Sequence, residues 1–535
     1  MPITRYVVTV AIAGALLLGI AVPSTYGEVL YNGIVLPEAW PPQMDQLPPD
    51  PVTPPYLESP PEVIPIDVGR QLLVDDFLID QTTLKQTLHR AMYYPENPVL
   101  VPDQPWETKT EPSPCAMVFS DGVWYDPQDK LFKMWYMGGY TAGTCYATSK
   151  DGIHWEKPKL DVFPDTNLVQ EGRRDSSTVW LDHGAGDPQS RFKMGYFTSG
   201  GLELCTSPDG IHWTEPARSG PTGDRTTFFH NPFRKRWIFG VRAGADGFGR
   251  IRRYWEAEDF LEGANWKSGE PVLWCGADSA DPARDDLKTK PQLYNLDCVA
   301  YESLLLGLFS IWRGQPADRA KPNEVCVGFS RDGFHWHRPD RQALVPVSER
   351  HGDWNWGNVQ SAGGCCLVVG DKLYFYVSGR AGVPGSRTSG VCTTGLATLR
   401  RDGFVSYDAE QGPGTLTTRP VRFQGRHLFV NADVDQGELR AEILDARGQV
   451  IAPFDRENSI PVREDSTLAE LRWQGAESLA PLAGKPIRLR FYLTRGSLYA
   501  FWVSPDRSGA SHGYVAAGGP RFAGPIDTVG RAAGP

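Results

Sequence analysis

The sequence predicts an all-β protein, a five-bladed β-propeller followed by a β-sandwich. The main observation is a phrase of the form Ser-x-Asp-Gly-x-His-Trp, which occurs at Ser149–Trp155, Ser207–Trp213 and Ser330–Trp336. Each copy follows a short apolar run of strand composition, and the chain after residue 410 alternates apolar and polar residues. An internal repeat with this content is typical of a propeller, in which each repeat forms one sheet.

The repeated phrase predicts a β-hairpin. Its Asp-Gly pair suits a two-residue loop with positive φ between antiparallel strands, and the Trp would begin the return strand. Two decayed copies are Leu399–Tyr407, with Tyr in the Trp place, and Arg253-Tyr-Trp ahead of Trp266. The aromatic positions 155, 213, 266, 336 and 407 are 58, 53, 70 and 71 residues apart. Each interval is long enough for one four-stranded sheet, so five blades are expected.

A hairpin of this form, placed before the last strand of a blade, resembles that of the five-bladed glycoside hydrolases of families 32, 43, 68 and 130. It is also similar to the Asp-box of sialidases, which has one more residue between Asp and Gly. The resemblance covers roughly residues 85–410. It implies a glycosidase in which the innermost strands line a central axis and acids at their starting ends converge on one face.

Glycosidases of both stereochemical outcomes need two carboxyl groups across the scissile bond. Four acids stand at the predicted starts of inner strands and are the candidate catalytic residues: Glu111, Asp175, Asp224 and Asp297. The resemblance implies a nucleophile or base in the first blade, a stabilising Asp in the second and a proton donor as the third acid. The sequence lacks the W-M-N-D-P-N-G and Glu-Cys motifs, and Arg173-Arg-Asp175 differs from R-D-P. The alternative for each acid is capping of a turn or pairing with an adjacent Arg.

Arginines form a second group of candidates. The second strands of blades three to five end near the same face, at Arg242, Arg313 and Arg380, and blade five has Asn358 where the other blades have an acid. Guanidinium groups bind carboxylate and sulfate well. These four residues are therefore the candidate substrate-binding groups, and an anionic glycan is the expected substrate. The alternative is that the arginines neutralise the axial acids.

Neither a metal nor a cofactor is predicted. The repeat histidines His154, His212 and His335 recur in every clear copy, so a structural role in the hairpin is expected. No Cys-x-x-Cys or His-x-x-x-His pattern occurs, which leaves a structural zinc site without support. The nine cysteines all lie between Cys115 and Cys392. Their odd number excludes complete pairing within the chain, and they are expected to be small buried hydrophobes.

The N-terminus predicts export. Residues 1–27 contain one basic residue, the apolar run Tyr6–Val22 and small or turn residues up to Gly27, as in a cleaved secretory signal. The alternative is a membrane anchor, which the run could almost provide. A secreted or periplasmic location without a stable membrane span is therefore expected. Residues 28–66 hold four Pro-Pro pairs and predict an extended linker or, alternatively, a segment wrapped over the propeller.

The remaining chain divides into three parts. The propeller is expected over residues 67–410, with an opening strand at Arg70–Asp80 that pairs with the last blade. Residues 411–517 predict the β-sandwich, because segments such as Ile487–Leu493 alternate between turns. Its position resembles that of the sandwich attached to family 32 enzymes. Residues 518–535 are expected to be a flexible tail.

The composition limits which classes of binding partner are expected. A formal net charge of −10 argues against nucleic acid. The chain contains 17 Trp, and aromatic residues make up 11% of it. Such a content suits both packing between β-sheets and flat surfaces that contact sugar rings. The sequence therefore predicts a glycoside hydrolase-like enzyme with a carbohydrate substrate. The alternatives are a non-catalytic carbohydrate-binding propeller and a family 130-like phosphorylase, in which phosphate would occupy the arginine group.

Overall fold

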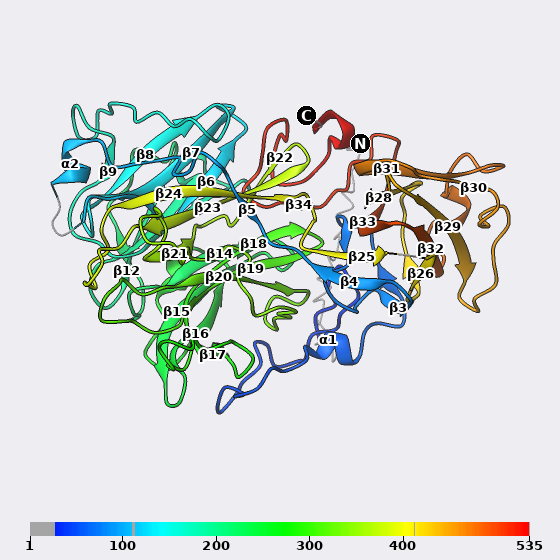
Figure 1. The fold of residues 1–535 in the computed structure, drawn as a ribbon, viewed down its shortest axis with the longest axis horizontal. Coiled ribbons are helices and arrows are strands. Elements are labelled where there is room, and N and C mark those ends of the chain that lie inside the picture. The colour runs from blue at the N-terminus through cyan, green and yellow to red at the C-terminus, as the bar shows by residue number, and fades with distance from the viewer. Residues whose placement is uncertain (1–26, 110–112, 411, 534–535) are drawn as a thin grey trace, which may run out of the picture.

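A computed structural model describes residues 27–109, 113–410 and 412–533. The predicted signal segment before residue 27 and the candidate acid Glu111 lie outside these ranges. Within them the chain forms seven β-sheets, five of four or five strands and two larger ones. The α-helices that the structure describes are single turns, α1 (Pro55–Glu58) and α2 (Pro105–Thr108). The five smaller sheets and the two larger ones lie on opposite sides of the view in Figure 1.

The five smaller sheets follow one another along the chain. The first contains β6 (Ala116–Asp126), β7 (Leu131–Gly138), β8 (Gly143–Ser149) and β9 (Leu168–Gln170). The second contains β10 (Ser177–Leu181), β11 (Phe192–Phe197), β12 (Leu202–Ser207) and β13 (Ala217–Arg218). The third contains β14 (Thr227–Asn231), β15 (Arg236–Ala245), β16 (Gly249–Ala257) and β17 (Val272–Cys275).

The fourth and fifth sheets each receive a strand from elsewhere in the sequence. The fourth contains β18 (Gln292–Glu302), β19 (Leu304–Trp312), β20 (Glu324–Ser330) and, from the C-terminus, β34 (Tyr514–Val515). The fifth contains β21 (Asn358–Ser361), β22 (Leu367–Val369), β23 (Lys372–Arg380), β24 (Cys392–Arg400) and, from the N-terminal part, β5 (Met92–Tyr93).

The first strands of these five sheets contact one another in a closed cycle. Strand β6 contacts β10, β10 contacts β14, β14 contacts β18, β18 contacts β21, and β21 contacts β6 again. Each of these five strands comes first along the chain in its series of antiparallel strands. Residues at equivalent ends of these strands therefore meet although they are far apart in the sequence.

The three clear copies of the repeated phrase share one hydrogen-bond pattern. In the first, Asp151 accepts hydrogen bonds from the backbone N–H groups of Ile153 and His154 at 2.8 and 2.9 Å. The His154 ring lies 2.7 Å from the same carboxylate, and the second and third copies repeat these contacts at Asp209 and Asp332. The histidines are therefore structural, as predicted.

The loop itself is longer than the predicted two residues. Backbone pairing stops at Thr148 and resumes at Glu156, and of the Asp-Gly pair only Gly152 has a positive φ, of 77°. The Asp side chain replaces the missing strand pairing because it accepts hydrogen bonds from the backbone N–H groups of the loop. Each loop packs on a neighbouring sheet: Trp135 of β7 donates to the Gly210 carbonyl of the second copy at 2.7 Å, and Tyr376 of β23 donates to the Gly152 carbonyl of the first copy.

The two larger sheets combine the C-terminal region with strands from residues 64–88. One contains β1 (Ile64–Pro65), β3 (Ile79–Thr82), β26 (Gly414–Thr418), β27 (Val421–Arg422), β29 (Glu438–Asp445) and β32 (Ile487–Thr494). The other contains β2 (Gln71–Leu72), β4 (Lys85–Leu88), β25 (Val405–Ala409), β28 (His427–Asp433), β30 (Ser459–Ile460), β31 (Asp465–Trp473) and β33 (Gly496–Ser504).

Three sequence-based boundaries differ from the structure. Residues 70–80 do not pair with the last small sheet, because β2 pairs with β33 and β3 with β26. Strand β5 takes that place instead, and its Tyr93 packs edge-on against Trp354 with ring centroids 5.6 Å apart. Strand β25, which follows the decayed hairpin, also joins a larger sheet. The predicted flexible tail is wrong for residues 518–533, since Phe522 and Asp527 are buried there.

Residues 28–66 pack onto the rest of the chain. Leu30, Leu36 and Tyr56 are buried. The Asn32 side chain donates to the Arg331 carbonyl at 2.8 Å, and the Tyr56 hydroxyl donates to the His335 carbonyl at 3.3 Å. These contacts, which fall on the third hairpin, match the alternative of a wrapped segment and not that of a free linker.

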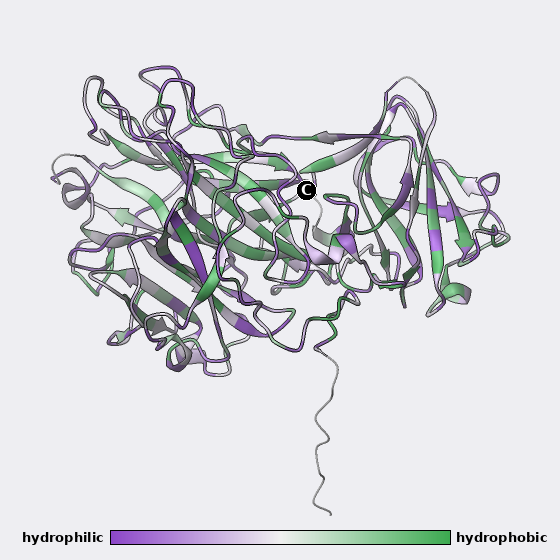
Figure 2. Ribbon diagram, turned by 90° about the horizontal axis from the view of Figure 1, so that it is seen from below, coloured by the Kyte–Doolittle hydropathy of each residue, from purple (hydrophilic) through white to green (hydrophobic). Residues whose placement is uncertain are grey.

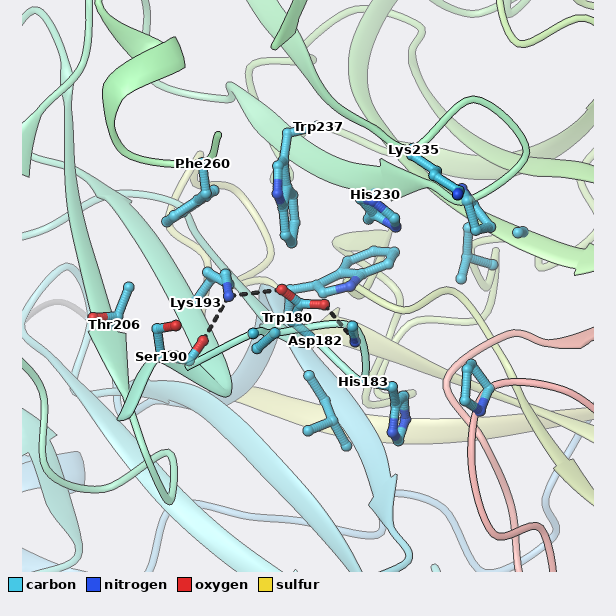
Figure 3. Close-up of a pocket in the computed structure, with 18 of the residues that line it drawn as sticks. Trp180, Asp182, His183, Ser190, Lys193, Thr206, His230, Lys235, Trp237 and Phe260 are labelled. Atoms are coloured by element: carbon cyan, nitrogen blue, oxygen red, sulfur yellow. Dashed lines mark hydrogen bonds and ion pairs between the residues drawn. The ribbon is translucent and has the colours of Figure 1, made fainter. Parts of the chain in front are cut away.

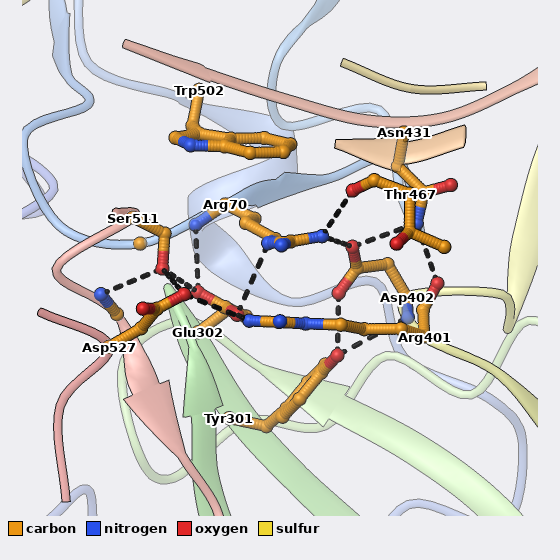
Figure 4. Close-up of polar contacts among 12 residues, drawn as sticks. Arg70, Tyr301, Glu302, Arg401, Asp402, Asn431, Thr467, Trp502, Ser511 and Asp527 are labelled. Atoms are coloured by element: carbon orange, nitrogen blue, oxygen red, sulfur yellow. Dashed lines mark hydrogen bonds and ion pairs between the residues drawn. The ribbon is translucent and has the colours of Figure 1, made fainter. Parts of the chain in front are cut away.

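A buried ionic network joins the smaller sheets, the larger sheets and the C-terminal segment (Figure 4). Arg70 pairs with Asp402 at 2.8 Å, and Arg401 pairs with Glu302 at 2.9 Å and with Asp527 at 3.1 Å. All five side chains are almost completely buried. Because each charge depends on a partner from a distant part of the chain, the network fixes how these parts meet.

Apolar residues run along the strands of both groups of sheets, and polar residues gather in the loops (Figure 2). One hydrophobic cluster extends from Leu30 through Trp135 to Phe501 and Phe522. Of the helices in the described ranges, none is long and apolar enough to cross a bilayer.

Candidate functional site

The central feature of the candidate site is a bulge in β6. Pairing with β7 passes from Met117 directly to Gly122, so residues 118–121 are left out of the ladder. Ser120 has a φ of 61°, a conformation that is costly for a residue with a side chain. A bulge bends the strand and redirects its side chains. Here it turns Phe119, Ser120 and Asp121 toward three different groups of polar partners.

Gly363 makes room for this bulge. A Cβ at this position would lie 2.9 Å from the carbonyl oxygen of Ser120 and 3.2 Å from that of Asp121. Contacts this short exclude a side chain unless the backbone moves. The connection between β21 and β22 therefore supports the bulge through a glycine.

Asp121 forms a buried, two-pronged ion pair with Arg174. The Arg174 Nη2 atom lies 2.8 Å from Asp121 Oδ1, and Nη1 donates to Oδ2 at 3.2 Å. Burial raises the pKa of the Asp121 carboxyl, and the Arg174 guanidinium partly offsets that effect. Neither residue was among the predicted site residues.

Asp297 occupies the same axis and is held by three neutral donors. Its Oδ2 atom accepts hydrogen bonds from Ser361 at 2.6 Å, from the Asn295 amide at 2.7 Å and from Ser120 at 3.3 Å. Burial raises the pKa of Asp297 from 3.8 to about 6. The Oδ1 atom is buried and makes no hydrogen bond among the described residues. This predicted acid is therefore at the axis, but enclosed.

Two buried arginines lie over the Phe119 ring. The Arg225 guanidinium is 3.7 Å and that of Arg380 5.2 Å from the ring centroid. Arg225 donates to Gln360 at 2.5 Å, and Arg380 donates to the Tyr140 hydroxyl at 3.2 Å. Within the described ranges neither guanidinium forms an ion pair with a carboxylate. Buried positive charge without a carboxylate partner favours an anionic ligand.

The pKa of Tyr294 indicates a positive electrostatic potential in this region. Its hydroxyl accepts a hydrogen bond from Lys321 at 2.8 Å. Burial alone would raise the pKa of the Tyr294 phenol, yet Lys321, Arg225 and Arg380 together lower it. The site thus stabilises negative charge on an oxygen at this point.

Asp175 and Asp224 lie at the mouth, where the chain enters β10 and β14. The Asp175 side chain is partly exposed, and its carbonyl accepts a hydrogen bond from Arg174 at 3.0 Å. Asp224 is 46% exposed, and its Oδ1 atom lies 3.5 Å from Nε of Arg242. The Ser176 hydroxyl donates to the Asp224 carbonyl at 3.2 Å and connects the two segments. Both carboxyls can therefore be reached from solvent.

The other predicted binding residues have different partners. Arg313 is buried and pairs with Glu324 at 3.0 Å, so the structure does not leave it free at the mouth. Its partner is on the neighbouring strand β20, which the sequence spacing did not indicate. Asn358 donates to the Lys321 carbonyl at 2.8 Å and accepts from Gln360 at 2.7 Å. It thereby orients the amide that contacts Arg225.

A separate cavity of about 910 Å³ lies at the opposite ends of β10 and β14. Trp180, Trp237 and His230 line it, together with the ion pair of Lys193 and Asp182, whose atoms are 2.7 Å apart (Figure 3). No motif in the sequence indicated this cavity. Among the described residues, no group of three or more His, Cys, Asp or Glu side chains is placed to hold a metal ion.

Comparisons with known proteins found no matching family model and no matching curated protein. The similar solved structures include an N-acetylgalactosamine deacetylase from F. plautii, at 14% identity and a TM-score of 0.40, covering 59% of this chain and 96% of that one. They also include a thermostable family-43 glycoside hydrolase, at 14% identity and a TM-score of 0.37, covering 55% of this chain and 94% of that one.

A third similar structure is a fructofuranosidase from Schwanniomyces occidentalis, at 13% identity and a TM-score of 0.35, covering 77% of this chain and 96% of that one. A family-43 glycoside hydrolase is thus among the similar structures. At such low identity they supply no residue correspondence for the site.

Proposed function

We propose that this chain is an exported glycoside hydrolase-like enzyme with a five-bladed β-propeller and a C-terminal β-sandwich. The closed cycle of β6, β10, β14, β18 and β21 supports the propeller, because a ring of sheets is needed to bring these strands together in this order. The two larger sheets support the sandwich. The apolar run Tyr6–Val22 supports export.

One observation carries the proposed activity: accessible carboxyls stand at the mouth of an axis whose interior is buried and rich in cations. Asp175 and Asp224 begin adjacent inner strands and are linked through Ser176. Hydrolysis of a glycosidic bond needs one carboxyl to protonate the leaving oxygen and another to attack or to activate water.

The roles follow from position. Asp224, at the third inner strand, takes the role of proton donor, and Asp175 stabilises the positive charge that develops on the sugar ring. Glu111, which precedes the first inner strand in the sequence, takes the role of nucleophile or base. Asp297 is enclosed by Ser120, Ser361 and Asn295, so it acts as a positioning residue for the bulge.

The proposed substrate is an anionic glycan. Arg225 and Arg380 supply buried guanidinium groups, and Lys321 acts with them to lower the pKa of Tyr294. A uronate or sulfate group one sugar away from the cleaved bond would find a planar donor there. Arg242 lies beside Asp224, as the alternative of charge neutralisation expects.

The test compares neutral, uronate-containing and sulfated polysaccharides with the purified full chain, with Arg380→Met and with Arg313→Met as the control. Arg380→Met should reduce activity on the anionic substrates at least tenfold more than on the neutral one, since a charged contact contributes about 1.5–3 kcal/mol. Arg313→Met should change stability without changing this ratio. A higher activity of the unaltered protein on neutral substrates would overturn the charge assignment.

A non-catalytic carbohydrate-binding protein is the second candidate. The tryptophan-lined cavity at the opposite end of the inner strands favours it, because aromatic surfaces are common partners of sugar rings. Glycan binding without release of reducing ends would support this alternative. Activity that requires inorganic phosphate and yields a sugar phosphate would instead indicate a phosphorylase.

A further inference from the structure

Cys115 and Cys392 meet where the first and the last of the five smaller sheets adjoin. Cys115 immediately precedes β6, Cys392 begins β24, and the two are partners in an isolated parallel bridge. The backbone N–H of Cys392 donates to the Pro114 carbonyl at 2.9 Å. Residues paired across neighbouring strands have Cα atoms about 5 Å apart, within the range of about 4.4–6.8 Å that a disulfide spans.

The two side chains also belong to the same cluster. Both side chains are fully buried in a small apolar cluster with Met117, Phe119 and Met137. The Cys115 thiol donates to the Met137 carbonyl at 3.5 Å, and the Cys392 thiol donates to the Gly390 carbonyl at 3.6 Å. All nine cysteines are present as free thiols in the structure. The backbone pairing and the shared cluster thus suit a bond between these two without a change of fold.

Arg380 makes the pair chemically unequal. It is the register partner of Cys392 on the adjacent strand β23. Burial raises the pKa of the Cys392 thiol, but its neighbours Cys115 and Arg380 lower it further than burial raises it. The Arg380 guanidinium thus favours the thiolate form of Cys392, and the thiolate is the attacking species in thiol–disulfide exchange.

We propose that Cys115 and Cys392 are a disulfide site, oxidised by a low-molecular-weight disulfide or by a protein disulfide of the same chemistry. The Cys392 thiolate attacks one sulfur of the external disulfide, whose S–S bond breaks and whose other half leaves as a thiolate. Cys115, after losing its proton to that thiolate, attacks the Cys392 sulfur and releases the second half as a thiolate, which takes a proton from solvent. Two protein thiols are oxidised, and one disulfide is reduced to two thiols.

The bond would covalently close the ring of sheets. It would join the strand that carries the Phe119–Asp121 bulge to the strand that pairs with Arg380. Because both thiols are buried, the reaction takes place mainly before the ring has closed completely. The site therefore belongs to folding in an oxidising medium, and it does not depend on the proposed substrate.

The test treats the full chain with oxidised glutathione in two arms: the native protein, and protein unfolded in urea and refolded. After quenching with iodoacetamide and digestion without reductant, a peptide containing Cys115 linked to one containing Cys392 is expected in the refolded arm at least. The intact mass should be lower by two hydrogens, and the thermal midpoint should be several degrees above that of protein refolded with a reducing agent.

Cys115→Ser and Cys392→Ser should each abolish the linked peptide and the difference between the two midpoints, whereas Cys205→Ser should leave both unchanged. Cys205 is a suitable control because it is also buried, on strand β12, away from the junction. Alkylation of both Cys115 and Cys392 in both arms, or linkage of either one to a different cysteine, would overturn the proposal.

Discussion

Replacing Asp224 by Asn separates a catalytic role of this carboxyl from a structural one. Asp224 is 46% exposed, and its one ion pair within the described residues is the 3.5 Å contact with Arg242, which is itself 33% exposed. Such a pair contributes about 0–1 kcal/mol to stability, so the melting temperature should fall by less than about 2 °C. Loss of a general acid should lower turnover by about 100-fold or more, equivalent to about 2.7 kcal/mol of barrier.

The assay measures initial rates of reducing-end release from the best polysaccharide substrate, with melting curves on the same preparations. Asp246→Asn is the matched control, because Asp246 is an exposed acid in the loop between β15 and β16. Full activity of Asp224→Asn would remove this residue from the chemistry. A loss of activity that parallels a large drop in melting temperature would show that Asp224 acts by supporting the fold.

Three further predictions concern the interior. Gly363→Ala should displace the bulge and lower turnover about tenfold or more, whereas Gly524→Ala, where a Cβ meets nothing within 4 Å, should not; equal activities would contradict the role of Gly363. Asp297 has its folded-state pKa raised from 3.8 to about 6, so it binds protons more tightly when folded and its contribution to stability falls by about 3 kcal/mol as pH rises from 4 toward 7. The urea midpoint of Asp297→Asn should not show this decline with pH. Parallel pH profiles of the urea midpoint for the variant and the unaltered protein would refute the prediction. Arg401→Met should lower the free energy of unfolding by about 3–5 kcal/mol, because Glu302 and Asp527 lose a buried partner. Lys85→Met, at an exposed ion pair, should lower it by less than about 1 kcal/mol. Similar urea midpoints for the two variants would refute the importance of the network.

Much of the sheet arrangement could be predicted because its determinants are local. The Asp of each clear hairpin binds backbone N–H groups two and three residues ahead, so the motif specifies its own loop. Asp259 makes the same contacts to Leu261 and Glu262 in the decayed copy of the third sheet, ahead of Trp266. There the aromatic residue is displaced to Trp266, which explains why the sequence pattern weakens.

The exchange of strands between sheets could not be predicted, because it depends on pairing across hundreds of residues. Strand β34 completes the sheet of β18, and β5 completes that of β24. The sequence of each is short and carries no register information of its own. For the same reason Asp527 was assigned to a tail, although it pairs with Arg401.

The site was predicted in part. Asp175 and Asp224 could be located from their places before inner strands, but Asp121 and Arg174 were missed. A signal was present: Ser120-Asp-Gly122 interrupts an otherwise apolar strand, and a glycine inside a strand often marks a bulge. The donors around Asp297 come from three different sheets, and no spacing rule connects them.

The most direct test of the proposed activity is the release of reducing ends from a uronate-containing or sulfated polysaccharide by the full chain and by an Asp175→Asn/Asp224→Asn double variant of matched melting temperature. The unaltered protein should release reducing ends steadily without added phosphate, and the double variant should release them at least 100-fold more slowly. Equal rates from the two proteins, or no release by the unaltered protein from any polysaccharide that it binds, would contradict hydrolysis at this mouth.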